Sequence, residues 1–251
     1  MPDFQLNRQT TNGKSPLFRI AIICVLALQV GCSSFTRGAN TSVIDPSKQK
    51  ADIQLALAQT AERKGEVADA ILSYQKVTEL DDQNAEAWHH LGLMQDQMGR
   101  ASEATENYRR SLAITDSQPT VWNDLGYNLY LLEQWSESEA AFQKAISLDS
   151  SAPRARINYG LLLARTGRPN ESMRQFYHSG ITEAEARCNI AIALLEEGQV
   201  AGAAQQLNLA QQADLDGLAT EKIAGARRLC NLAQQSAERM AKQNQQAAGQ
   251  F

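Results

Sequence analysis

The stretch that decides the fold runs from residue 85 to residue 118 and reads AEAWHHLGLMQDQMGRASEATENYRRSLAITDSQ. The next 34 residues, 119 to 152, repeat its pattern as PTVWNDLGYNLYLLEQWSESEAAFQKAISLDSSA. Each stretch carries Trp-x-x-Leu-Gly near its start, at Trp88 and Trp122, and an aromatic residue in its second half, Tyr108 or Phe142. A fixed period of this length indicates structural repeats, in which each unit buries its apolar face only against its neighbours.

Extension of the period in both directions divides the chain into five units, at 51–84, 85–118, 119–152, 153–183 and 184–216. In the second half of each unit a small residue precedes a large apolar or aromatic residue by four positions, which places both on one face of a helix. These pairs are Ala70 with Tyr74, Ala104 with Tyr108, Ser138 with Phe142, Ser172 with Phe176 and Ala203 with Leu207.

With these residues at these offsets, the chain resembles the tetratricopeptide-repeat family. The resemblance implies an all-α fold, a right-handed superhelix of about five helix-turn-helix repeats. An apolar-periodic segment at 217–243 is expected to form a C-terminal cap helix with a polar outer surface, and 244–251 a disordered tail. Proteins of this family bind other proteins, so the resemblance favours binding over catalysis.

The turn between the two helices of a unit requires a residue that tolerates positive φ, and glycine does so without steric cost. Gly65, Gly99, Gly167 and Gly198 stand at this place, but the third unit has Glu133. A left-handed conformation at a non-glycine residue costs roughly 1 kcal/mol, so we expect this turn to be distorted. The fourth unit is three residues short, and the fifth restarts with a capping box of Thr182 and Glu185.

The N-terminus has the layout of a secretion signal: basic residues, an apolar run from Ile20 to Leu28, and then Gly31-Cys32. Residues 28–32 resemble a bacterial lipobox, which implies a lipoprotein-type signal peptide at 1–31, lipidation (palmitate included) of Cys32 and a flexible tether at 32–50. Gln29 departs from the aliphatic residue usual in that motif, and the alternative is a stray cysteine in an ordinary leader. By the same resemblance, Ser33 is compatible with anchoring at the periplasmic face of the outer membrane.

Composition and charge exclude several kinds of function. Removal of the leader would change the formal net charge from −4 to −6, and an acidic chain without a basic stripe is not expected to bind nucleic acid. The three histidines have no metal-ligand spacing, so we expect no metal, no cofactor, no small-molecule substrate and no catalytic residue. Cys188 and Cys230 either form a disulfide or are buried free thiols, and their apolar surroundings favour free thiols.

Tetratricopeptide repeats bind partners on a concave groove, lined at set positions of each first helix, and the resemblance carries that groove onto this chain. The implied partner-binding residues are Gln59, Glu62, His89, Leu93, Asp96, Asn123, Tyr127, Tyr130, Leu161, Arg165, Ile192 and Leu195. The alternative for the aliphatic members is packing against the next unit. The basic clamp that some family members use for peptide C-termini is absent: the matching places hold Leu55, Gln59, His90 and Asp124, with Asn158 and Asn189 at the sixth position of later units. An amphipathic helix or an extended apolar segment is the expected ligand.

Three functions are compatible with these features. The first is a lipid-anchored adaptor that assists the assembly or localisation of an envelope machine, as in repeat lipoproteins of pilus and secretion systems such as the tight-adherence pilus. The second is a docking regulator of cell-wall hydrolases or proteases, or a soluble secreted adaptor. The third, an enzyme, has no candidate nucleophile, base or metal site.

Overall fold

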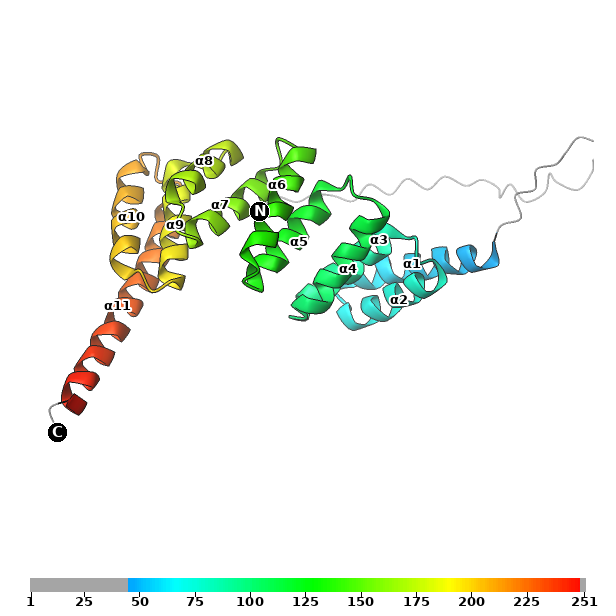
Figure 1. Ribbon diagram of the computed structural model, residues 1–251, viewed down its shortest axis with the longest axis horizontal. Helices are drawn as coiled ribbons and strands as arrows, with labels where there is room; N and C mark the ends of the chain where they lie inside the picture. Colours follow the sequence, from blue (N-terminus) through cyan, green and yellow to red (C-terminus); the bar gives the residue numbers. More distant parts are fainter. Residues whose placement is uncertain (1–44, 249–251) are drawn as a thin grey trace, which may run out of the picture. The chain divides into compact units, whose positions relative to one another are not determined.

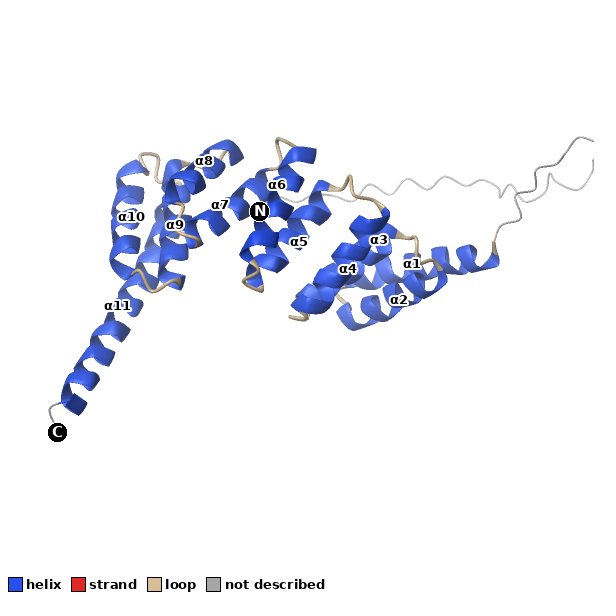
Figure 2. Cartoon of the chain, viewed as in Figure 1, coloured by secondary structure: helices blue, strands red, loops and turns tan. Residues whose placement is uncertain are grey.

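The computed structural model describes residues 45–248, and these form eleven helices and no strand (Figures 1 and 2). The helices are α1 (Pro46–Lys64), α2 (Val67–Leu80), α3 (Ala85–Gln97), α4 (Ala101–Ile114), α5 (Pro119–Leu131), α6 (Trp135–Leu148), α7 (Pro153–Arg165), α8 (Pro169–Ser179), α9 (Glu183–Glu196), α10 (Val200–Ala213) and α11 (Thr220–Ala248). The all-α fold expected from the 34-residue period is confirmed.

Consecutive helices form five hairpins, and the hairpins stack. α1 packs on α2, α3 on α4, α5 on α6, α7 on α8 and α9 on α10, while α2, α4 and α6 each contact the first helix of the next pair. The first helices also follow one another directly, α5 beside α7, α7 beside α9 and α9 beside α11. This row of first helices carries the predicted groove.

Small residues let the two helices of a hairpin approach closely. A Cβ atom added at Gly92, Gly126 or Gly160 would lie 2.6–2.7 Å from the ring of Tyr108, Phe142 or Phe176, inside van der Waals contact. Each glycine and its aromatic partner stand at the same two positions of successive units. The Leu-Gly element of the repeat is therefore a packing requirement.

The tryptophan of the repeat joins successive units. The indole Nε1 of Trp88 donates to the carbonyl of Asp82 at 2.9 Å, and that of Trp122 donates to the carbonyl of Asp116 at 2.7 Å. In the fourth unit Arg156 stands at this position and its Nη2 donates to the carbonyl of Ser150 at 2.7 Å. A guanidinium thus replaces the indole as the donor that closes the loop between units.

The turns within the hairpins have the expected left-handed residue, including the turn without glycine. Gly65, Gly99, Gly167 and Gly198 have φ between 71° and 77°, and Glu133 has φ 58°. The amide of Glu133 donates to Tyr130 O at 3.0 Å and the next amide to Leu129 O at 2.9 Å, the same two bonds that close the turn at Gly99. The prediction of a distorted turn is wrong, because the strain is confined to one φ angle.

The outer helices are longer than the sequence predicts. α1 begins at Pro46, so Pro46–Lys50 is helix rather than the end of a tether; Asp45 caps it by accepting the amide of Ser47, and Pro46 occupies the first turn. α11 runs to Ala248, so residues 244–248 are helical rather than a disordered tail. The predicted capping box of Thr182 and Glu185 is present at the start of α9.

Several other predictions concern the chain ends and the cysteines. The signal peptide at 1–31, Cys32 and tether residues up to 44 lie outside the described residues. Within 45–248, no helix combines the length and apolar character needed to span a membrane. Cys188 and Cys230 are buried free thiols in the core shared by α9, α10 and α11, so the disulfide alternative is wrong.

Candidate protein-binding groove

The first helices of units 2 to 4 enclose a hollow of about 400 Å³, which we call the central pocket. It is lined by Leu93, Asp96, Tyr108, Asn123, Asp124, Tyr127, Arg154, Asn158 and Leu161. Five of these, Leu93, Asp96, Asn123, Tyr127 and Leu161, belong to the predicted groove. The side chain of Tyr127 is the most exposed of these apolar groups, at 42 %.

A row of polar side chains crosses the central pocket from unit 2 to unit 4. His89 Nε2 lies 2.9 Å from Asp124 Oδ2, and Asp124 Oδ1 accepts from Asn123 Nδ2 at 3.1 Å. Asn158 Nδ2 in turn donates to Asn123 Oδ1 at 2.9 Å. The first and third of these bonds join neighbouring units and the second lies within α5, so the polar groups of the pocket are oriented before any partner arrives.

Two carboxylates of the groove are held by tyrosines from the second helices. The hydroxyl of Tyr74 donates to Glu62 at 2.5 Å, and that of Tyr108 donates to Asp96 at 2.6 Å. Burial and the adjacent carboxylate raise the pKa of both tyrosines far above its usual range, so they remain donors at any physiological pH. In the third unit, Tyr130 stands at the position of the carboxylate and Phe142 at the position of the tyrosine, so this unit has no such pair.

The central pocket carries two carboxylates, Asp96 and Asp124, and one guanidinium, Arg154. Burial raises the pKa of Asp96 above its ordinary value, the hydrogen bonds from Tyr108 and Asn128 oppose the rise, and the charge of Asp124 adds to it. Within residues 45–248, neither Asp96 nor Asp124 forms an ion pair with a lysine or an arginine. The pocket therefore presents carboxylates that a cationic group of a ligand would stabilise.

Two predicted groove residues, Tyr130 and Arg165, lie in a cluster that joins units 3, 4 and 5. The Arg165 guanidinium lies 5.4 Å from the ring centroid of Tyr130 and 5.0 Å from that of Trp135. Its Nε donates to Glu197 at 2.8 Å, and it also pairs with Glu133 and Glu196. Tyr130 is buried and stacks on Tyr127. Through the stacking of Tyr130 on Tyr127, this cluster adjoins the central pocket.

The remaining predicted residues lie away from the central pocket. Gln59 donates to Glu86 at 2.9 Å, and Glu62 contacts His90 Nδ1 at 3.0 Å, so both join unit 1 to unit 2. Ile192 and Leu195 are half-buried and pack on the core of α9, α10 and α11. Both residues therefore contact neighbouring helices, and a role for them in partner binding stays a prediction.

Four lining residues were outside the predicted groove set. Tyr108 comes from a second helix and reaches the pocket because its hydroxyl extends past Gly92 to Asp96. Arg154 lies in the first turn of α7, while Asp124 and Asn158 stand at the sixth position of their units. The succession of polar residues at that sixth position is the sequence signal that indicates them.

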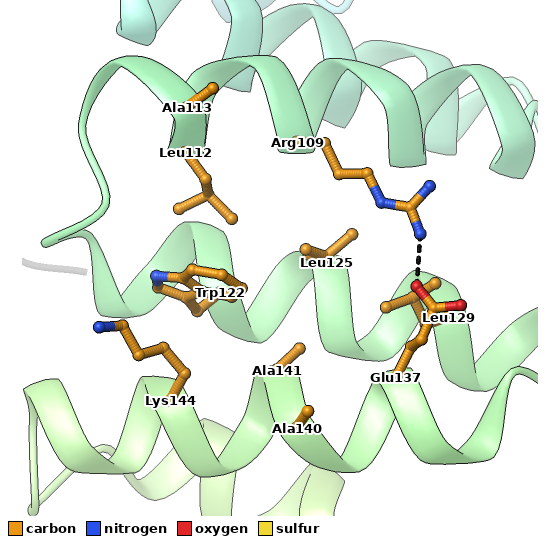
Figure 3. Close-up of a pocket in the computed structure, with 10 residues that line it drawn as sticks. All are labelled: Arg109, Leu112, Ala113, Trp122, Leu125, Leu129, Glu137, Ala140, Ala141 and Lys144. Atoms are coloured by element: carbon orange, nitrogen blue, oxygen red, sulfur yellow. Dashed lines mark hydrogen bonds and ion pairs between the residues drawn. The ribbon is translucent and has the colours of Figure 1, made fainter.

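A second hollow, of about 550 Å³, lies between α4 and α6 with α5 as its floor (Figure 3). Its floor consists of Trp122 and of the core residues Leu125 and Leu129, and small residues such as Ala140 leave it open. The ion pair of Arg109 and Glu137, at 2.7 Å, spans it at one end. The charged groups that line it are paired, Arg109 with Glu137 and Lys144 with Asp116 at 3.9 Å.

Within the described part of the chain, no three His, Cys, Asp or Glu side chains are grouped as ligands of a metal ion.

A tetratricopeptide-repeat family model matches residues 55–119 and 123–182. A search of curated protein sequences found no match.

Solved structures with the same fold include three repeat proteins. YrrB, described as a repeat protein with an unusual peptide-binding site, is 24% identical with a TM-score of 0.57 over 76% of this chain and 98% of its own. PilW, described as a type IV pilus biogenesis factor, is 22% identical with a TM-score of 0.54 over 74% of this chain and 90% of its own. PilF of Pseudomonas aeruginosa is 21% identical with a TM-score of 0.51 over 81% of this chain and 100% of its own. The repeat period, the stack of hairpins and the family match all agree with this shared fold. The chain is therefore a tetratricopeptide-repeat protein.

Proposed function

We propose that the chain is a lipid-anchored, periplasmic protein-interaction scaffold that assists the assembly or localisation of an envelope machine such as a pilus or secretion system. The observation that carries the binding role is the central pocket, which combines exposed apolar surface with oriented polar groups. Exposed apolar surface on a repeat protein marks a protein-binding site. Tyrosine suits such a site because its ring is rigid and its hydroxyl remains polar.

The composition of the pocket favours a peptide segment as the ligand. Leu93, Tyr127 and Leu161 offer apolar contact, while Asn123 and Asn158 carry amide groups that can bond main-chain atoms of an extended segment. The peptide-binding site named for YrrB supports this class of ligand.

The envelope role rests on the N-terminal sequence and on two of the structural relatives. The basic segment, the apolar run and Gly31-Cys32 favour export and lipid attachment. The fold shared with PilF, and with PilW, which is described as a pilus biogenesis factor, supports a role in pilus assembly. Ser33 favours the outer membrane.

Membrane anchoring is tested by Cys32→Ser, with Cys24→Ser in the apolar run as the matched control. The full chain is expressed in a bacterium, the envelope is fractionated, and the mature N-terminus is determined by mass spectrometry. We expect the Cys24 variant to stay in the membrane with a diacylated or triacylated Cys32 and the Cys32 variant to be released or retained unprocessed. A Cys32 variant that is processed and still membrane-bound contradicts lipid anchoring, and so does an unmodified cysteine in the parent chain.

A further inference from the structure

The side chains of the C-terminal half of α11 are mostly exposed from residue 231 to residue 243, and in the described chain this half of the helix belongs to no core cluster. Ile223, Ala226 and Cys230 anchor its first half in the core of α9 and α10. Beyond them the helix continues to Ala248, and Figure 1 shows it running past α9 and α10. Leu229, Leu232 and Met240 are exposed at 54%, 60% and 62% and share one face at helical spacing. An isolated helical segment of this length is marginal in water, so a docking surface would stabilise it.

This helix is also basic in an otherwise acidic protein. It carries five basic residues and two acidic ones, namely Lys222, Arg227, Arg228, Arg239 and Lys242 against Glu221 and Glu238. Arg227 donates to Leu207 O at 3.4 Å. Arg228, Arg239 and Lys242 are exposed and form no ion pair with any residue between 45 and 248. On the helix surface, Arg228 and Arg239 lie along one edge of the apolar face of Leu229, Leu232 and Met240.

The groove of the same protein has the complementary pattern. The central pocket combines Leu93, Tyr127 and Leu161 with the carboxylates of Asp96 and Asp124. Asp124 contacts His89, and Arg154 also lines the pocket, but neither carboxylate has a lysine or an arginine within ion-pair distance in the described chain. Three turns of helix, from Leu229 to Met240, extend about 17 Å. A basic amphipathic helix laid in a groove with apolar and acidic groups is an established mode of peptide recognition.

We propose that the C-terminal half of α11 of one copy docks in the central pocket of a second copy of this chain. Its apolar face would contact Tyr127 and Leu161, and Arg228 and Arg239 would face Asp96 and Asp124. The interaction is between copies, because Ile223 and Cys230 are buried against α9 and α10 and hold α11 away from units 2 to 4 of its own chain. This inference rests on the proposed function of the groove: self-docking and partner binding exclude each other, and the partner releases the self-associated form.

The test places a photo-crosslinking amino acid at Ser236, which lies between Leu232 and Met240 on the exposed face. Two full-length copies with different tags are co-expressed, irradiated in the cell, purified on one tag and probed for the other. We expect a crosslinked dimer in which mass spectrometry maps the second copy to α3, α5 or α7. No dimer, or a dimer crosslinked outside these helices, overturns the proposal.

Charge reversal tests the same contact. Arg228→Glu with Arg239→Glu is expected to reduce the crosslinked fraction about tenfold, since attraction becomes repulsion at two positions. Lys76→Glu with Arg174→Glu, at exposed sites on α2 and α8, is the control and should leave it unchanged. The near-isosteric Asp124→Asn on the receiving copy should reduce it about threefold. An unchanged fraction in the Arg228 and Arg239 variant, with its circular dichroism melting curve intact, contradicts the proposal.

The outcome also separates this inference from the proposed function. A crosslinker at Tyr127 that captures a different envelope protein, while Ser236 captures no second copy, overturns self-docking and leaves the adaptor function standing. If neither position captures a protein, both are overturned. A second copy captured from Ser236, in competition with the partner captured from Tyr127, supports both.

Discussion

Glu133 holds the left-handed backbone conformation that glycine holds at the turns of four other units. Its side chain is exposed, and its carboxylate pairs with the Arg165 guanidinium at 3.3 Å. An exposed pair of this kind contributes little to stability, so it does not offset the backbone strain. The side chain and the backbone conformation of Glu133 therefore affect stability in opposite directions.

Glu133→Gly separates these two effects. The change removes a left-handed strain of roughly 1 kcal/mol and an ion pair worth less than that, so we expect the free energy of unfolding to rise by about 0.5 kcal/mol. Glu133→Ala is the control: it loses the ion pair but keeps the strain, so it should be neutral or slightly destabilised. Urea denaturation measures both, and equal stability of the two variants would contradict the strain argument.

Burial also decides the chemistry of Cys188. Desolvation by the surrounding core raises the pKa of its thiol, so the reactive thiolate is scarce at pH 8. In the native protein, we expect iodoacetamide to label Cys188 only as fast as the protein unfolds. In 6 M guanidinium, labelling should be complete within minutes. Peptide mass spectrometry after timed labelling provides the measurement. Rapid labelling of Cys188 in the native chain would show that the core of α9, α10 and α11 is open.

At the scale of helices, the contact between a glycine and an aromatic ring sets how closely each hairpin closes. Gly126→Ala would place a methyl group 2.7 Å from the ring of Phe142, which is fully buried and cannot move aside. We expect a loss of about 1–3 kcal/mol in unfolding free energy from overpacking. Thermal melting followed by circular dichroism reports the loss.

Gly225→Ala in α11 is the matched control for Gly126→Ala. The nearest atom to its added methyl group is the tip of Arg228 at 3.9 Å, and alanine favours a helix interior over glycine by about 0.5–1 kcal/mol. This variant should therefore melt at or above the temperature of the parent chain. A Gly126→Ala variant with the same melting temperature as the Gly225→Ala variant would disprove the packing role of the repeat glycine.

The helices follow closely from the sequence where the repeat itself specifies them. Glycine or aromatic residues at fixed offsets define each hairpin, and the capping box at Thr182 defines the start of α9. The ends of the array follow less closely, because no neighbouring unit imposes a period there. Asp45 and Pro46 extend α1 through a local capping interaction, and α11 continues through a Gln- and Ala-rich segment in which nothing breaks a helix.

At the scale of the whole molecule, the groove could be predicted only in part. First-helix positions identify Leu93, Asp96 and Tyr127 because the repeat fixes which face of each helix points inward. They cannot distinguish a free side chain from one engaged by another unit, and Arg165 is engaged by units 3 and 5. They also miss Tyr108, whose hydroxyl reaches the pocket from a second helix.

Arg165 connects three units, and its loss should make their unfolding less cooperative. Arg165→Ala removes three carboxylate contacts and two cation–π contacts, and we expect about 1–2 kcal/mol lower stability. Because stability in repeat proteins depends on the contacts between neighbours, the urea m-value should fall as well. Arg110→Ala, which removes an ion pair with Glu106 and a cation–π contact with Trp88, both within unit 2, should leave the m-value unchanged. Equal m-values for the two variants would contradict a coupling role.

We propose that the pocket around Tyr127 binds a protein partner in the envelope. The most direct measurement is photo-crosslinking in intact cells from residue 127 of the full chain, with the same amino acid at Tyr177 as control. Tyr177 is 80 % exposed on α8, outside the central pocket. We predict that position 127 captures a defined set of envelope proteins that position 177 does not. Identical products from both positions, or none from position 127, would contradict the claim.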